Sequence, residues 1–169
     1  MKTIVLLCGA DRSGKTSTLR RFFGFSGDLR SKQLLERTLD GKKVYAVHLG
    51  SPQELANDFC NLEKVKPRIE KRIQKCEEAS KGQDYVLIIP FTLFVEEGKI
   101  NERCILDPIE SLKARGFKVA PIYLRKEKTV YLELKDSFMN RITKYVIRSN
   151  KEYDRQAREL ETIINLVDP

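Results

Sequence analysis

The sequence contains no apolar run that approaches the roughly 20 residues of a membrane-spanning helix. Its first apolar run, residues 3–8, is too short for a signal peptide and is followed at once by Gly9. We therefore expect a cytoplasmic protein with no membrane partner.

Metal-ligating side chains are scarce. The four cysteines form no CxxC pair and His48 is the only histidine, so no zinc site is readable. His48 lies inside a strand-like run, where a structural role is favoured over catalysis. Apolar residues surround each cysteine, which favours small buried side chains in a reducing compartment over disulfides. These cysteines are Cys8, Cys60, Cys76 and Cys104.

The composition is that of a folded globular protein. Of the 169 residues, 41% are hydrophobic and 33% charged, which is enough apolar material for one core. No repeat, linker or low-complexity tract divides the chain, so residues 1–169 are expected to form a single domain. The net charge of +8 favours polyanionic partners, which could be nucleotide phosphates or nucleic acid, or it reflects only a solvated basic surface.

Three apolar runs, at 3–8, 84–90 and 118–124, are typical of strands buried on both faces. Helical patterns alternate with them. This order predicts an α/β fold, with a mostly parallel central sheet flanked by helices and a ligand site at the carboxyl ends of the strands. The expected helices cover residues 15–23, 62–81, 107–115 and 153–167.

Residues 34–49 suit a hairpin at one edge of the sheet, because Asp40-Gly41 is a favoured two-residue turn. The alternative is a helix over 34–39, which would leave a strand at 44–49. Pro90 indicates where the strand before it leaves the sheet, since proline cannot donate to a central ladder.

Cap residues and apolar stripes predict where the helices begin and which face they bury. Asp107-Pro108 predicts a helix start, and Ser149 with Glu152 forms a capping box for the last helix. That helix has an apolar stripe of Tyr153, Ala157, Leu160, Ile164 and Val167. In 62–81 the stripe is Leu62, Val65, Ile69, Ile73 and Cys76, and the charged face carries Lys64, Arg68, Lys71, Arg72 and Lys75.

The stretch from Gly9 to Thr16 reads GADRSGKT and matches GxxxxGK(S/T). In such a loop the backbone N–H groups wrap a phosphate, Lys15 reaches the β- and γ-phosphates, and Thr16 ligates Mg²⁺. The helix that follows adds its positive N-terminal end. ATP, or another nucleoside triphosphate, with Mg²⁺ is therefore the expected ligand. The expected binding residues are Gly9, Ala10, Asp11, Arg12, Ser13, Gly14, Lys15, Thr16 and Ser17.

The loop resembles that of P-loop kinases, and its "DRSGKT" is most similar to thymidylate kinases and related nucleoside monophosphate kinases. The resemblance implies the sandwich fold of P-loop NTPases. It also implies that Arg12 helps to hold the donor γ-phosphate and that Asp11 faces the acceptor nucleotide.

The chain departs from that family at the next core strand, which ends with residues 88–92 (IIPFT) and lacks both the Asp-Arg pair that engages the acceptor and a magnesium-organising carboxylate. Asp84 stands at the wrong end of this strand and suits a turn. Three alternatives remain: Mg²⁺ is held by Thr16 and waters, a carboxylate such as Glu54 or Asp11 substitutes, or hydrolysis is feeble. No NKxD motif follows, which favours adenine over guanine.

Arg141, Lys144 and Arg148 are spaced by three and four, so we expect them on one face of a basic helical lid around residues 126–149. Together with Lys15 and Arg12, Arg141 and Arg148 are the candidate catalytic residues. The alternative is a solvated amphipathic helix. Two further candidates are Arg125, as a third lid cation, and Glu54, as a base or a first-turn glutamate.

The leading functional hypothesis is a Mg²⁺- and ATP-dependent phosphotransferase that acts on a nucleotide, a nucleoside or another small acceptor. A nucleotide-binding regulatory NTPase with slow turnover is the first alternative. The second is a nucleic-acid 5′-end kinase, for which the helix at 62–81 offers a modest excess of basic residues but no aromatic residue to stack on bases. Nucleic-acid binding is accordingly expected to be weak and salt-dependent.

Overall fold

The computed structural model describes residues 1–27, 34–55, 62–96, 98–126 and 132–169. Its strands are β1 (Thr3–Ala10), β2 (Leu35–Leu39), β3 (Lys42–Ala46), β4 (Val86–Leu93), β5 (Val95–Glu96), β6 (Lys99–Ile100), β7 (Lys118–Lys126) and β8 (Tyr145–Ser149). Its helices are α1 (Lys15–Phe23), α2 (Pro52–Leu55), α3 (Leu62–Ser80), α4 (Arg103–Ala114), α5 (Leu132–Ile142) and α6 (Tyr153–Val167).

Six strands form one sheet in the order β2-β3-β4-β1-β7-β8, and every pairing in it is parallel except β2 with β3. The expected edge hairpin is therefore confirmed, and the helical alternative for 34–39 is wrong. Its turn places Asp40 at φ 47° and Gly41 at φ 83°, the left-handed pair that a tight hairpin needs. The mostly parallel α/β sheet expected from the sequence is present.

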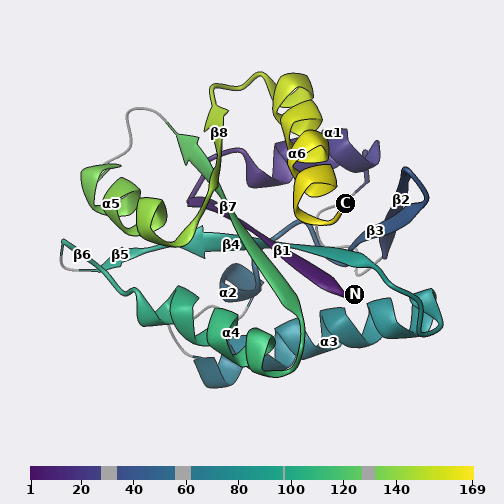
Figure 1. The fold of residues 1–169 in the computed structure, drawn as a ribbon. Helices are drawn as coiled ribbons and strands as arrows, with labels where there is room; N and C mark the ends of the chain where they lie inside the picture. The colour runs from purple at the N-terminus through teal and green to yellow at the C-terminus, as the bar shows by residue number, and fades with distance from the viewer. Residues whose placement is uncertain (28–33, 56–61, 97, 127–131) are drawn as a thin grey trace.

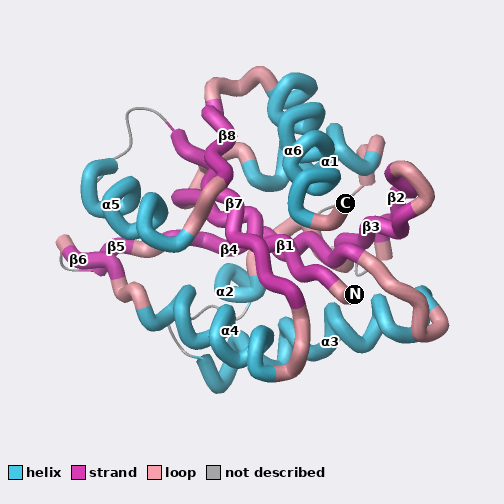
Figure 2. Tube along the Cα trace, viewed as in Figure 1, coloured by secondary structure: helices cyan, strands magenta, loops and turns pink. Residues whose placement is uncertain are grey.

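Helices cover both faces of this sheet (Figures 1 and 2). Helices α1 and α6 lie on one face, and α3, α4 and α5 supply the buried side chains of the other. Every residue of β1 and β4 is buried, as expected for central parallel strands covered on both sides. Among the described residues no helix is long and apolar enough to cross a membrane.

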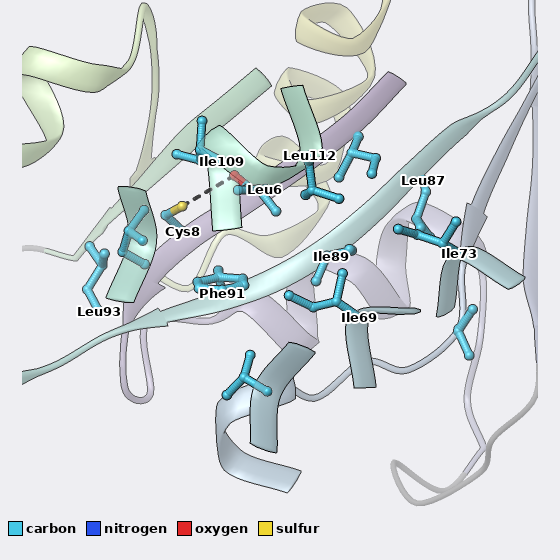
Figure 3. Packing of buried hydrophobic residues seen from close by; sticks show 14 of the residues in the cluster. Leu6, Cys8, Ile69, Ile73, Leu87, Ile89, Phe91, Leu93, Ile109 and Leu112 are labelled. Atoms are coloured by element: carbon cyan, nitrogen blue, oxygen red, sulfur yellow. Dashed lines mark hydrogen bonds between the residues drawn. The ribbon is translucent and has the colours of Figure 1, made fainter. Parts of the chain in front are cut away.

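Figure 3 shows the core on the α3 and α4 side of the sheet, where Ile69 and Ile73 approach Leu87 and Ile89 of β4. Val65, Ile69, Ile73 and Cys76 are buried as the helical stripe predicts, while the side chain of Leu62 lies outside the described part. The charged face predicted for this helix is wrong at one position, Arg72. Arg72 is 1% exposed and donates from Nη2 to the backbone oxygen of Gly50 at 2.8 Å.

Of the cysteines, Cys8 and Cys76 are buried, Cys104 is half-buried, and Cys60 lies outside the described residues. Burial raises the pKa of Cys8 to about 12, although Lys15 opposes the shift. This thiol therefore stays protonated and acts as a small apolar side chain beneath the loop that follows β1.

Both proline predictions are wrong. Pro90 lies inside β4, opposite Leu7 of β1. On the other side of β4 the pairing with β3 stops at Leu87, so the missing N–H of Pro90 falls where the strand has one neighbour. Helix α4 begins at Arg103, about one turn before the expected start, and Pro108 lies inside it.

Two predictions for the C-terminal third of the chain are also wrong. The helix expected across residues 126–149 is only partly formed, because residues 145–149 form strand β8. Ser149 does not cap α6, whose flanking residue Glu152 makes no side-chain cap hydrogen bond. The apolar stripe of α6 is present from Ala157 to Val167, with Tyr153 half-buried at its start.

Candidate functional site

The loop between β1 and α1 has a backbone that requires glycine at two positions. Gly14 has φ 91°, and a Cβ added there would lie 3.1 Å from Cε1 of Tyr153. A Cβ added to Gly9 would lie 2.3 Å from Oγ of Ser13. The chain therefore passes tightly around the loop and enters α1 at Lys15, leaving the first N–H groups of that helix facing outwards.

Lys15 is folded across its own loop and is only 6% exposed. Its Nζ donates to the backbone oxygens of Gly9 at 3.1 Å and Ala10 at 2.7 Å, and it lies 3.4 Å from Oγ of Ser13. The ammonium is thus held at the loop with hydrogen-bond partners that a phosphate oxygen could replace.

A cavity of about 360 Å³ opens over this loop. It is lined by Asp11, Arg12, Ser13, Gly14, Lys15, Thr16, Ser17, Leu49, Ser51 and Tyr153. Seven consecutive residues of the GxxxxGK(S/T) stretch and its helix start therefore share one cavity. Asp11 is the one acidic side chain among these described lining residues, and none of them is histidine.

The segment after β3 forms one wall of the site. Oγ1 of Thr16 donates to the backbone oxygen of Leu49 at 3.1 Å, and Oγ1 of Thr92 lies 2.9 Å from Oγ of Ser51. The Gln53 amide pairs with the backbone of Thr92, donating to its oxygen at 3.2 Å and accepting from its nitrogen at 3.4 Å. A side chain thereby takes the place of a neighbouring strand where β3 no longer pairs with β4.

A magnesium ion would find hydroxyl and carbonyl oxygens here. Thr16, Ser51 and Leu49 bring such groups to the cavity. On β4, Thr92 lies opposite Gly9 of β1, at the end of the strand where a magnesium-organising carboxylate would be expected. Among the described residues there is no group of three or more His, Cys, Asp or Glu side chains that could hold a metal ion, and the side chain of Glu54 lies outside them. The donors fit a Mg²⁺ that keeps several waters and takes its remaining ligands from phosphate.

Residues of β8 and α6 hold the opposite wall. Oγ of Ser149 donates to the backbone oxygen of Ser13. Gln156 is fully buried; its Nε2 donates to Oγ1 of Thr18 at 2.8 Å and its Oε1 accepts from the Asn150 nitrogen at 3.1 Å. Tyr153 stands between these contacts and lines the cavity.

The expected lid cations are not brought together over the cavity. Arg141 is 60% exposed and pairs with Glu102, while Arg148 lies on β8, opposite Arg125 in the sheet. The shared helical face predicted for Arg141, Lys144 and Arg148 is wrong, because β8 interrupts the helix. None of these arginines is among the described residues that line the cavity, whereas Arg12 and Asp11 are.

Arg125 forms an ion pair with Asp136 of α5. Its Nε and Nη2 each lie 2.9 Å from Oδ2 of Asp136, whose Oδ1 accepts from the Tyr123 hydroxyl at 2.8 Å. Burial, followed by the bond to Asp136, raises the pKa of Tyr123 above its usual range, so this hydroxyl remains a donor. These contacts fix α5 against the carboxyl-terminal part of β7.

Two buried polar residues, Lys135 and Gln156, were not expected from the sequence, and a third, Arg72, was expected on the charged face of its helix. Each had a readable signal, because each occupies a helical position within an apolar stripe. Lys135 precedes Phe138 and Met139 by three and four residues, and both of those are buried. A polar side chain on such a stripe indicates a specific partner or a site.

No protein-family model and no curated protein matches this chain. Similar solved structures include a de novo designed PLOOP2X3_50 fold protein at 18% identity and a TM-score of 0.47, covering 99% of this chain and 94% of that one. A second de novo designed protein has 18% identity and a TM-score of 0.45, over 98% and 91% of the two chains. A probable GTP-binding protein, EngB, has 11% identity and a TM-score of 0.39, over 97% and 99%.

Proposed function

We propose that this protein binds a nucleoside triphosphate with Mg²⁺ in the cavity over residues 11–17. The observation that carries the proposal is the joint placement of Lys15, the glycine-dependent loop backbone and the start of α1 around one cavity of about 360 Å³. Backbone N–H groups and the positive end of α1 would hold the phosphate chain, and Lys15 would exchange its carbonyl partners for β- and γ-phosphate oxygens.

Magnesium, when bound, neutralises phosphate charge and orients the terminal phosphate. Thr16 is the residue that would hold the ion. Ser51 lines the same cavity and could bind a water on the metal. Thr16 donates to Leu49 through the same hydroxyl. Occupation of the site therefore acts directly on the segment that follows β3.

We infer slow turnover and a regulatory role as the better-supported outcome of binding. Among the described cavity residues the only carboxylate is that of Asp11 and there is no histidine, so few groups could activate a water or an acceptor hydroxyl. The contacts of Thr16 with Leu49, and of Arg72 with Gly50, link the site to the β3–α2 segment and to α3. A bound nucleotide could thus order a surface without donating its phosphate.

An ATP-dependent phosphotransferase remains the second candidate. The favouring observation is that Asp11 and Arg12, the residues of the kinase-like loop, line the open cavity. Arg12 would then stabilise the transferring phosphate and the acceptor would enter beside Asp11. A nucleic-acid 5′ end is one acceptor of this kind.

Lys15→Ala tests the binding proposal. The variant removes the ammonium group that would bind two phosphates. Triphosphate affinity should fall by about 100-fold or more, because charge-assisted hydrogen bonds contribute about 1.5–3 kcal/mol each. The measurement is equilibrium titration of ATP and GTP with Mg²⁺, and Lys113→Ala on the exposed surface of α4 is the matched control. Equal affinities of Lys15→Ala and wild type would show that the cavity does not hold phosphate.

Product formation separates the two candidate outcomes. Phosphate release and ADP formation are followed with nucleosides, nucleoside monophosphates and 5′-hydroxyl oligonucleotides present in turn. Tight binding with turnover that no acceptor accelerates supports the regulatory role. Acceptor-stimulated ADP formation by any of these compounds supports the phosphotransferase instead.

A further inference from the structure

Tyr153, at the start of α6, lines two cavities. One is the phosphate cavity over residues 11–17. The other, of about 340 Å³, lies between α1 and the start of α6, two helices that pack side by side (Figure 1). Its volume is within the range of about 300–1,000 Å³ that is typical of small-molecule sites. Besides Tyr153, the described residues that line it are Arg21, Lys151, Glu152, Asp154, Arg155 and Arg158.

The separation of the two cavities suits one molecule that occupies both. Ser17 lines the phosphate cavity and Arg21 lines the second cavity. Both residues belong to α1 and are four positions apart, so they lie on one face of the helix, about 6 Å from each other along its axis. A nucleoside is longer than this separation. A nucleotide whose phosphates lie on the loop can therefore reach the second cavity with its sugar and base.

Contacts on both sides of Tyr153 fix its position. A Cβ added to Gly14 would lie 3.1 Å from Cε1 of Tyr153, so the ring packs directly against the phosphate loop. Ser149 and Gln156, which flank Tyr153 in the sequence, bond to the loop and to α1. These bonds hold the backbone around Tyr153, so its ring loses little conformational freedom when a ligand packs against it.

Two of the cations around the second cavity are paired with carboxylates of the same cavity. Nη1 of Arg21 lies 3.6 Å from Oδ1 of Asp154, and Nε of Arg155 lies 3.0 Å from Oε2 of Glu152. This pairing weakens the attraction of the second cavity for a further phosphate. An aromatic ring with polar side chains beside it is instead the kind of surface on which nucleobases stack.

We propose that Tyr153 binds the base of the nucleotide by stacking, with the nucleoside in the second cavity between α1 and α6. This rests on the proposed triphosphate site, to which it adds a nucleoside subsite. The ligand is then a nucleotide rather than a bare polyphosphate, because part of its affinity comes from the base.

Titration of Tyr153→Leu with ATP·Mg²⁺ and with tripolyphosphate and Mg²⁺ tests the proposal, because tripolyphosphate carries the phosphate chain without the nucleoside. ATP affinity should fall by about 10- to 100-fold, the effect expected when a base loses its aromatic stacking partner. Tripolyphosphate affinity should change by less than about threefold, because the phosphate contacts remain. Tyr153→Phe should keep the wild-type ATP affinity, since it keeps the ring. Tyr145→Leu is the matched control, because Tyr145 is also half-buried but lines neither cavity.

Equal losses of affinity for ATP and tripolyphosphate in Tyr153→Leu would show that Tyr153 only shapes the loop beside Gly14, and the proposal would be overturned. NMR spectra at saturating ATP give a second readout. The base protons should shift upfield on binding to wild type and Tyr153→Phe, through the ring current of the stacked aromatic side chain, and this shift should be lost in Tyr153→Leu. Unshifted base protons in the wild-type complex would also refute stacking.

The same titrations separate this proposal from the one on which it rests. If wild-type protein binds ATP and tripolyphosphate equally well, and Tyr153→Leu changes neither affinity, the phosphate site stands and the nucleoside subsite is refuted. If Lys15→Ala leaves ATP binding unchanged, or if wild-type protein binds neither compound, both proposals fail together.

Discussion

The two flanks of the phosphate loop are built differently. On the α6 flank, Ser149 and Gln156 bond directly to Ser13 and Thr18, and these contacts are buried. On the α5 flank, Asp136 bonds to Arg125 and Tyr123 of β7, and no hydrogen bond from α5 to the loop is present among the described residues. The first flank holds the loop directly, whereas the second holds β7, the strand that pairs with β1.

This difference suggests a division of roles. A loop that must present its N–H groups to a phosphate needs one side that fixes its shape, and neutral hydrogen bonds to Ser13 and Thr18 do so without adding charge. The α5 flank instead braces β7, which pairs with β1 as far as Gly9. Variants on the α6 flank should therefore change the loop as well as stability, and variants on the α5 flank should change stability first.

Gln156→Leu should have the largest effect, since it breaks the α6 flank at its centre. The buried Oγ1 of Thr18 and the part-buried Asn150 N–H each lose their partner, and an unsatisfied buried group costs about 1–3 kcal/mol. We expect a loss of about 3 kcal/mol in the free energy of unfolding, measured by urea denaturation. Gln74→Leu, on the exposed side of α3, should change it by less than about 0.5 kcal/mol. Equal losses for the two variants would contradict the role of Gln156.

Asp136→Ala breaks the anchor of the α5 flank. It removes the ion pair with Arg125 and leaves the Tyr123 hydroxyl without its acceptor, which should lower the free energy of unfolding by about 2 kcal/mol. It should change the affinity for ATP little, because no described residue of α5 lines the cavity. Denaturation and ATP titration measure the two effects, with the exposed Asp84→Ala as control. A loss of affinity as large as that of Gly14→Ala would show that α5 also shapes the loop.

Gly14→Ala strains the point where the α6 flank touches the loop. A side chain at φ 91° costs about 1–2 kcal/mol, and the new Cβ would lie 3.1 Å from the Tyr153 ring. Gly24→Ala is a matched control, because Gly24 is also left-handed, at φ 63°, but has nothing within 4 Å of the added Cβ. Both variants should lose stability by calorimetry, and Gly14→Ala alone should lose nucleotide affinity. A similar loss of affinity in Gly24→Ala would point to a general effect of helix α1.

Ser149→Ala should have the smallest effect, about 1 kcal/mol, since it removes one hydrogen bond to Ser13 while the remaining contacts of Gln156 persist. Triphosphate and diphosphate affinities should fall by the same factor, because the loop would hold phosphates that both nucleotides share. Thermal melting and the two titrations test this, and the exposed Ser111→Ala is the reference. A change in the ratio of the two affinities would mean that the α6 flank also senses the γ-phosphate.

Local patterns predicted the sheet, the hairpin and the loop because each depends on neighbouring residues. The strand at β1 follows from an unbroken apolar run, the Asp40-Gly41 turn from left-handed backbone angles, and the glycine-dependent loop from its spacing. The amphipathic stripes of α3 and α6 were likewise readable from their spacing.

The errors arose where a distant partner decided the outcome. Pro90 stays within β4 because β3 withdraws from that part of the strand, and Ser149 bonds to Ser13 rather than capping α6. The spacing of Arg141 and Arg148 suits a helix, but residues 145–149 pair with β7 as a strand. Such tertiary partners override local propensity.

The bond from Ser149 to Ser13, together with that from Gln156 to Thr18, joins segments 136 and 138 residues apart. Before such contacts can form, the chain between them must lose the conformational entropy that closing so long a loop requires. The phosphate loop is therefore among the last parts of the described chain to reach its final shape. The proposed nucleotide would stabilise the loop only after β8 and α6 have docked, so the protection it gives should extend to β8 and α6 together with the β1–α1 unit.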